Sequence, residues 1–317
     1  MIKSINQLVT QECNSHCKMC LIWTFGKDPN QMSPEEFGRL YSRKEFSSVE
    51  DLCISGGEPT LREDLPEIMD YVIPNIPQLK MLFLSTNCSF PERVVDFMIR
   101  NSGRVAEIYS CVSLEGDKET HKKIRGVDTH DLVVETLERV RGLKLPNAKS
   151  IISTTVQLEN ANIESMEYIK QLASKTRSTY SFRPAMISET FYGNNNTKNL
   201  HLTPDQIKFF VDYIKREKIN DPFMTIQKDF LEGKRILVGD KKSGIKCLAG
   251  DISVFIKSNG DIYPCINSKK IIGDKKRGLY FQDFKLGDME YCPCCTECQI
   301  YPMLNFSQYS DKRSEQR

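Results

Sequence analysis

The sequence predicts an α/β fold: an incomplete barrel of six parallel strands, each followed by a helix, with a small cysteine-rich domain after it. Apolar runs flanked by turn signals alternate with segments of helical period, which is the pattern of repeated βα units. Several of these runs are rich in Val and Ile, as buried parallel strands are. Nine of the 12 cysteines lie near the two ends of the chain, and 317 residues suggest about two domains.

The strand and helix candidates alternate along the first part of the chain. Strands are expected at residues 2–10, 51–55, 79–86, 105–114, 150–158 and 180–183. The first helix should begin after Ser33, a capping residue followed by Pro34 and an acidic pair. Further helices are expected near residues 65–73, 91–101, 131–143 and 163–175. Six such units give a partial (β/α)6 TIM-like barrel, with functional residues at the carboxyl ends of its strands.

Three cysteines follow the first expected strand in the pattern C-x3-C-x2-C: Cys13, Cys17 and Cys20. Three thiolates cannot saturate an Fe4S4 cluster at one per iron, so a cluster held here would leave one iron open to another ligand. The alternative is a structural zinc loop completed by His16 or by a distant fourth cysteine.

The cysteine pattern followed by Ser55, Gly56, Gly57, Glu58 and Pro59 resembles the radical S-adenosylmethionine (SAM) enzymes. The resemblance implies a [4Fe-4S] cluster on the three cysteines and SAM chelating the open iron. One electron would then cleave SAM to methionine and a 5′-deoxyadenosyl radical, which takes a hydrogen atom from a substrate. The residue before the third cysteine is often aromatic in that family and is Met19 here.

The same resemblance implies a set of SAM-binding residues at the strand ends. The segment from Gly56 to Pro59 would hold the SAM amino group, although a strand-ending turn that needs glycine is the alternative. Residues that would meet the ribose and carboxylate are Asn87, Ser113, Glu115 and Arg125, the last through a two-point guanidinium contact. Solvated loop positions are the alternative for Asn87 and Glu115. Further candidates at later strand ends are Asn160 or Asn162, after the fifth strand, and Arg183, after the sixth.

Three cysteines lie away from the two ends of the chain. Cys53 and Cys111 fall within strands, where a thiol usually acts as a small buried apolar group. Cys88 directly follows Asn87 at a strand end, so it could face the substrate cavity and donate a hydrogen atom. A loop thiol with no role is the alternative for Cys88.

A second cysteine set follows a polar stretch at residues 194–199. Residues 253–263 are expected to form a hairpin with an Asn-Gly turn, which would bring Cys247 and Cys265 together. This region resembles the SPASM and twitch extensions of radical SAM enzymes, which implies an auxiliary [4Fe-4S] cluster; zinc is the alternative. The further ligands would come from Cys292, Cys294, Cys295 and Cys298, of which Cys298 and one of the adjacent pair Cys294 and Cys295 are favoured.

These observations divide the chain into a barrel at 1–200, an auxiliary-cluster domain at 201–306 and a charged tail at 307–317. Lys and Arg number 44 against 42 Asp and Glu, a net charge of +2, so no global field attracts nucleic acid or anionic lipid. The sequence has no signal peptide pattern and no segment long enough to span a membrane, which predicts a cytoplasmic protein with its cysteines reduced.

The predicted function is therefore reductive SAM cleavage and hydrogen abstraction from a small molecule or a peptide. A small molecule is favoured, because no peptide-recognition extension precedes the first strand. A one-electron reductant such as flavodoxin or ferredoxin is the expected partner. The alternatives are a non-catalytic iron-sulfur or zinc scaffold and, at lower rank, an enzyme like the molybdenum-cofactor cyclase, whose glycine- and arginine-containing tail this chain lacks.

Overall fold

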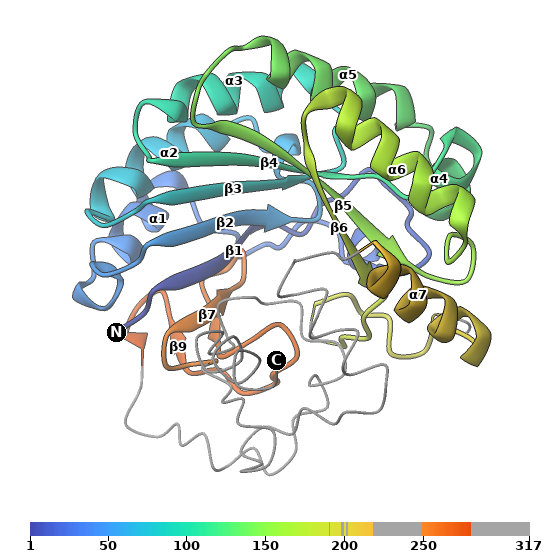
Figure 1. Cartoon of the computed structure of the whole chain (residues 1–317). Helices are drawn as coiled ribbons and strands as arrows, with labels where there is room; N and C mark the ends of the chain where they lie inside the picture. Colours follow the sequence, from blue (N-terminus) through green and yellow to red (C-terminus); the bar gives the residue numbers. More distant parts are fainter. Residues whose placement is uncertain (190, 198–199, 201, 218–248, 280–317) are drawn as a thin grey trace, which may run out of the picture.

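A computed structural model describes residues 1–189, 191–197, 200, 202–217 and 249–279. Within these residues one sheet of ten strands runs in the order β10-β9-β8-β7-β1-β2-β3-β4-β5-β6 (Figure 1). Cys247 and the four cysteines from 292 to 298 lie outside the described residues. The predictions made for them remain predictions.

Six parallel strands, β1 to β6, make up one side of the sheet and end at its edge strand β6, and their parallel arrangement is as predicted. Each lies beside its neighbour in sequence order. Their bounds are β1 Ser4–Thr10, β2 Asp51–Gly56, β3 Met81–Thr86, β4 Glu107–Ser113, β5 Ala148–Val156 and β6 Thr179–Pro184. The α/β barrel-like fold predicted from the sequence is confirmed.

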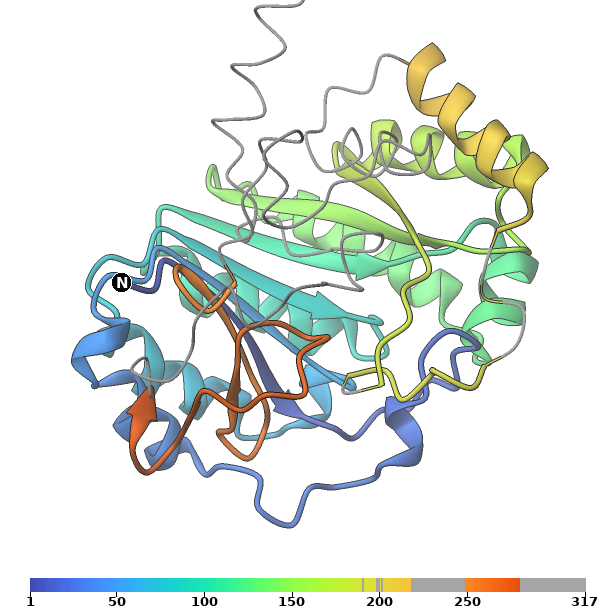
Figure 2. The same ribbon diagram turned by 90° about the horizontal axis from the view of Figure 1, so that it is seen from below.

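Helices cover the outer face of these strands (Figures 1 and 2). They are α1 Pro34–Tyr41, α2 Leu65–Val72, α3 Pro91–Ser102, α4 Lys118–Arg125, α5 His130–Gly142 and α6 Ile163–Thr176. Ser33 caps α1 as predicted, in a reciprocal pair with Glu36. The sequence analysis did not predict α4, which buries only His121 and Ile124 of its eight residues.

The strands alternate between an apolar outer face and an inner face that carries polar and thiol side chains as well as apolar ones such as Phe83. On β2, Leu52 and Ile54 are fully buried in the hydrophobic core beneath the helices. The intervening Cys53 and Ser55 instead line a cavity on the inner face. Because successive side chains of a strand point to opposite faces, this alternation sets the inner surface of the barrel apart from its core.

The chain after β6 returns to the barrel at two places. Helix α7, Pro204–Arg216, packs Phe210 and Tyr213 into the same hydrophobic cluster as Phe182 of β6. Strand β7, Ser253–Ile256, then pairs in parallel with β1 at the other edge of the six strands.

The predicted hairpin is confirmed, and it continues the barrel sheet. Strand β8, Ile262–Tyr263, pairs antiparallel with β7 through Phe255 and Tyr263. Gly260 takes the left-handed φ of +87° that the turn requires. Strands β9, Gly273–Asp274, and β10, Gly278–Leu279, extend this edge. No helix among the described residues combines the length and apolar character needed to cross a bilayer.

Candidate functional site

A cavity of about 950 Å³ occupies the inner face of the barrel. Ligand sites in proteins commonly have volumes of roughly 300–1,000 Å³, so this one could hold a large ligand. Residues from all six parallel strands and from the loop after β1 line it. The predicted site residues in the lining are Cys13, Cys17, Cys20, Gly56, Gly57, Asn87, Ser113, Arg125 and Arg183.

The cysteine loop is held at the cavity by backbone contacts on both sides. The N–H groups of His16 and Lys18 donate to carbonyls at the end of α4, and Leu21 N–H donates to Tyr192. At the end of α4, Gly126 has φ +69°, and an added Cβ would lie 2.6 Å from the His16 carbonyl oxygen. Only glycine permits this close contact between helix and loop.

Burial raises the pKa of the Cys13 thiol to about 11 and that of Cys20 to about 12, because a buried thiolate loses its hydration. Thiolates at such positions need a bound cation or cluster to offset that cost. No three His, Cys, Asp or Glu side chains in the described ranges converge as a single metal ion would require. In a cubane cluster each thiolate binds a different iron, and the loop supplies a suitable donor set.

The end of β2 lies against the start of the cysteine loop. Gly57 N–H donates to the Thr10 carbonyl at 2.9 Å, and Glu58 N–H donates to the Glu12 carbonyl at 2.8 Å. A Cβ on Gly57 would lie 2.1 Å from the Glu12 carbonyl oxygen. The paired glycines thus let two backbone segments meet immediately before Cys13, while both glycines also line the cavity.

Glu58 is not among the cavity-lining residues, so within the segment from Gly56 to Pro59 only the two glycines line the cavity. The carboxylate is fully buried and accepts four hydrogen bonds, two from Thr60, one from Thr86 Oγ1 and one from Asn87 N–H. Burial raises the pKa of Glu58, while these donors oppose the shift. Pro59 is also buried and begins a short 3-10 helix outside the cavity lining.

Asn87 connects the third strand end to the cysteine loop. Its Nδ2 group donates at 2.8 Å to Asn14 Oδ1 and at 2.8 Å to Ser15 Oγ. Both partners lie between Cys13 and Cys17, so this amide fixes the shape of the loop. Sequence analysis gave Asn87 a ligand-binding role, with a solvated loop position as the alternative, and did not single out Asn14 or Ser15.

Arg125, which lines the cavity, forms a buried ion pair with Glu115. The Arg125 guanidinium donates to Glu115, while another of its nitrogens lies 3.7 Å from Cys17 Sγ. Its Nε is buried and has no hydrogen-bond partner within the described residues. Burial raises the pKa of Glu115, and the Arg125 charge opposes that shift. Glu115 is fully buried, and its carboxylate accepts a hydrogen bond from Thr155 N–H. It is not among the cavity-lining residues, so this geometry does not favour the direct contact with SAM that was expected.

The two asparagines of the fifth strand end have local structural partners. Asn160 is buried and donates to the backbone carbonyls of Glu115 and Thr155, which holds the Glu115 segment in place. Asn162 caps α6 by accepting from Ser165 N–H. Neither asparagine is among the cavity-lining residues.

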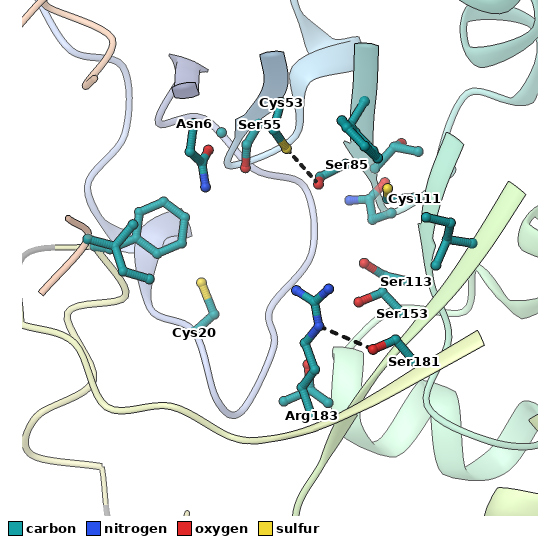
Figure 3. A pocket seen from close by; sticks show the side chains of 18 of the residues that line it. Asn6, Cys20, Cys53, Ser55, Ser85, Cys111, Ser113, Ser153, Ser181 and Arg183 are labelled. Carbon is teal, nitrogen blue, oxygen red and sulfur yellow. Dashed lines mark hydrogen bonds between the residues drawn. The ribbon is translucent and has the colours of Figure 1, made fainter. Parts of the chain in front are cut away.

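Hydroxyl and thiol groups follow one another around the inner surface of the barrel (Figure 3). They come from alternate positions on five strands, with Arg183 at the end of the series: Cys53, Ser55, Ser85, Cys111, Ser113, Ser153, Ser181 and Arg183. Arg183 Nε donates to Ser181 Oγ at 3.4 Å. Sequence analysis placed Cys53 and Cys111 correctly in strands but assigned them to the apolar interior.

Cys88 is not among the residues that line this cavity, whereas the sequence analysis expected that it could face a substrate there. Its side chain is fully buried in a hydrophobic cluster with Val112 and Val133 on the helix side of the sheet. The backbone at Cys88 has φ +61°, which turns the chain after Asn87. Cys265, in contrast, lies in the hydrophobic cluster against which Cys13 and Cys20 pack.

Residues 8–173 match the sequence profile of the Radical SAM superfamily. The chain belongs to this superfamily of enzymes. The match includes the three cysteines of the loop and the strand ends up to β5. The [4Fe-4S] cluster and SAM are the cofactors of this family, and the thiol loop, the glycine pair and the cavity fit them.

Two groups of sequence relatives match this radical SAM chain. The mycofactocin maturase MftC of Mycolicibacterium smegmatis is 25% identical over 283 residues, which cover 84% of this chain and 65% of that protein. A probable GTP 3′,8-cyclase of Methanococcus aeolicus is 34% identical over 148 residues, 45% of this chain and 48% of that protein. The chain thus spans just under two thirds of the length of the maturase.

Solved structures share the fold at low sequence identity. SuiB of Streptococcus suis bound to the precursor peptide SuiA has a TM-score of 0.64 and 16% identity, covering 93% of this chain and 66% of that one. The protein anSMEcpe with bound AdoMet has a TM-score of 0.65 and 19% identity, covering 94% and 84%. These likenesses extend over the barrel and beyond it.

Proposed function

We propose that this chain is a radical SAM enzyme that modifies a peptide, using an auxiliary [4Fe-4S] cluster as well as the cluster on Cys13, Cys17 and Cys20. The observation that carries the proposal is that these three thiols, the paired glycines and Arg125 line one cavity. When bound, the cluster and SAM supply a 5′-deoxyadenosyl radical after one-electron reduction. The residues of the chain bind, orient and enclose these groups.

We assign the cavity-lining residues of the site to parts of SAM by their positions. The Gly56 and Gly57 backbone, free of Cβ atoms, approaches the SAM amino group. Arg125 binds the SAM carboxylate, since Glu115 already fixes its guanidinium and a buried Nε remains without a partner. Asn87 and Ser113 contact SAM from the ends of β3 and β4. Glu58 and Glu115 position these groups and do not touch the cofactor.

A peptide substrate is favoured over the small molecule expected from the sequence. Two of the structural neighbours are solved with a peptide: SuiB with the precursor peptide SuiA, and anSMEcpe with the Cp18Cys peptide. The likeness to the probable GTP 3′,8-cyclase covers less than half of this chain and so does not favour a nucleotide substrate.

Cofactor loading is the first test. Anaerobic reconstitution should give about eight irons per chain, four for each of two cubane clusters. With dithionite, the loaded protein should convert SAM to 5′-deoxyadenosine slowly without substrate. The triple variant Cys13→Ala, Cys17→Ala, Cys20→Ala should lose this conversion and about half of the iron. Stoichiometric zinc without iron, or intact SAM with the wild type, would support the scaffold alternative.

The substrate class is tested with a low-molecular-mass cell extract. Extract that contains the substrate should increase 5′-deoxyadenosine formation above the substrate-free rate, and prior protease treatment of the extract should abolish the increase. An increase that survives the protease would favour a small molecule instead. The auxiliary cluster is tested by Cys247→Ala with Cys265→Ala, which should spare substrate-free cleavage of SAM and abolish the increase.

A further inference from the structure

Two thiols in the barrel have no place in the cofactor site. Cys53 on β2 and Cys111 on β4 both point into the cavity, as Figure 3 shows, and both are free. Ser85 on the intervening strand lies between them: its hydroxyl is 3.6 Å from Cys53 Sγ, and its backbone pairs with Cys111. The two thiols therefore lie near each other on the inner surface.

A packing role does not explain this placement. The apolar positions of the same strands, Leu52 and Val112, point to the opposite face and are fully buried there. Cys53 and Cys111 instead belong to the series of small polar groups that faces the cavity. A thiol differs from the serines around it in one chemical respect: its S–H bond is weaker than a C–H bond, whereas an O–H bond is stronger.

We propose that Cys53 and Cys111 are hydrogen-atom donors that quench a carbon-centred radical held in the barrel cavity. This inference rests on the proposed function, which places such a radical there. In the step, an S–H bond of one cysteine breaks homolytically, a C–H bond forms at the radical carbon, and a thiyl radical remains. One electron from the one-electron reductant and one proton from water restore the thiol.

The surroundings of Cys53 and Cys111 keep both thiols protonated, which is the form that can donate a hydrogen atom. Burial raises the pKa of Cys53, and it raises the pKa of Cys111 to about 12, with a further contribution from the neighbouring Cys53. Arg183 opposes both shifts. Both groups therefore carry their S–H hydrogen at neutral pH. A substrate radical quenched here would regain a hydrogen, so the reaction would leave the oxidation state of the substrate unchanged.

The test uses substrate-free SAM cleavage in D2O, with no small thiol in the buffer. Protein S–H groups exchange to S–D, whereas carbon-bound hydrogens do not. Quenching of the 5′-deoxyadenosyl radical by a protein thiol therefore yields monodeuterated 5′-deoxyadenosine, which mass spectrometry detects. Wild type should give the labelled product. The double variant Cys53→Ser, Cys111→Ser should still cleave SAM, but its label should fall to the level found in H2O.

The matched control is Cys88→Ala, which removes a buried thiol outside the cavity and should keep the label. Labelling that persists in the double variant, or an unlabelled wild-type product, would overturn the inference while leaving SAM cleavage established. A wild type that forms no 5′-deoxyadenosine would instead overturn the proposed function. In the protein without cofactors, a small methanethiosulfonate should modify Cys53 and Cys111 before Cys88, and the reverse order would also count against the inference.

Discussion

The carboxylate of Glu58 accepts a hydrogen bond from the backbone N–H of Asn87 at 2.6 Å and so joins the end of β2 to the end of β3. The Asn87 side chain in turn holds Asn14 and Ser15 of the cysteine loop. Glu58 does not line the cavity, but it therefore helps to set the geometry of the cysteine loop through Asn87.

Glu58→Gln should destabilise the fold. Four donors converge on the two carboxylate oxygens, and an amide group would place its own N–H groups against some of them. Leaving one buried donor without an acceptor costs about 1–3 kcal/mol. We expect urea denaturation to show a loss of that size in the free energy of unfolding. Glu63→Gln, at an exposed position, should change it by less than about 0.5 kcal/mol. Equal stability of the two variants would contradict the assigned role of Glu58.

Gly57→Ala should impair cluster binding. Its Cβ would overlap the Glu12 carbonyl oxygen at 2.1 Å, so β2 and the segment before Cys13 must move apart. Overpacking of this kind costs about 1–3 kcal/mol. Iron content after reconstitution should fall along with stability. Gly103→Ala is the matched control, because nothing lies within 4 Å of its added Cβ. Normal iron content in the Gly57 variant would show that the contact is not needed.

Arg125→Ala should leave Glu115 as an uncompensated buried carboxylate. Breaking a buried ion pair by removing one partner costs about 3–5 kcal/mol. Urea denaturation of the cofactor-free protein measures this loss. Arg139→Ala removes an exposed pair with Glu135 on α5 and should cost about 0.3–0.5 kcal/mol. If Glu115→Gln added to Arg125→Ala restored no stability, the loss would have another cause.

Asp51→Asn should stabilise the protein at neutral pH. Burial raises the Asp51 pKa from 3.8 to about 6, and its Oδ1 has no partner within the described residues. A raised carboxyl pKa means that the folded state binds the proton more tightly, so stability falls as pH rises from about 4 through 6.

The raised Asp51 pKa corresponds to a loss of about 3 kcal/mol in the free energy of unfolding at neutral pH if no solvent reaches the carboxylate. Solvent screening at this partly exposed group reduces that loss to about 1 kcal/mol. The variant should therefore exceed wild type by about 1 kcal/mol at pH 8 and match it near pH 4. Denaturant melts across this pH range measure the difference. A difference that does not change with pH would rule out titration of Asp51 as its source.

Sequence patterns predicted the strands well because buried apolar runs define them. Every observed strand end lies within two residues of the expected one. Helix α4 was not predicted because only two of its residues, His121 and Ile124, are buried. Two positions are too few to show the apolar periodicity of a helix among its charged residues. Two end signals were present, since Asp117 caps the helix and Gly126 ends it in a left-handed conformation.

Side-chain direction limited the prediction of the site. Glu58 directly follows two glycines, where strand alternation no longer indicates which way a side chain points, and it proved to be buried behind the loop. Cys53 could have been placed, because its neighbours Leu52 and Ile54 are the apolar positions of β2. The cavity itself depends on the curvature of the sheet, which no local pattern encodes.

The parallel pairing of β1 with β7 has a consequence for how the chain folds during synthesis. Ser4 pairs with Asp51 of β2 on one side and with Ser253 of β7 on the other. The β7 side of β1 therefore stays unpaired until the ribosome has synthesised most of the chain. At ~5–20 residues per second, that delay is about 12–50 s. An open strand edge is a template for association with other chains. A chaperone that covers this edge until β7 has been synthesised should therefore increase the yield of folded protein.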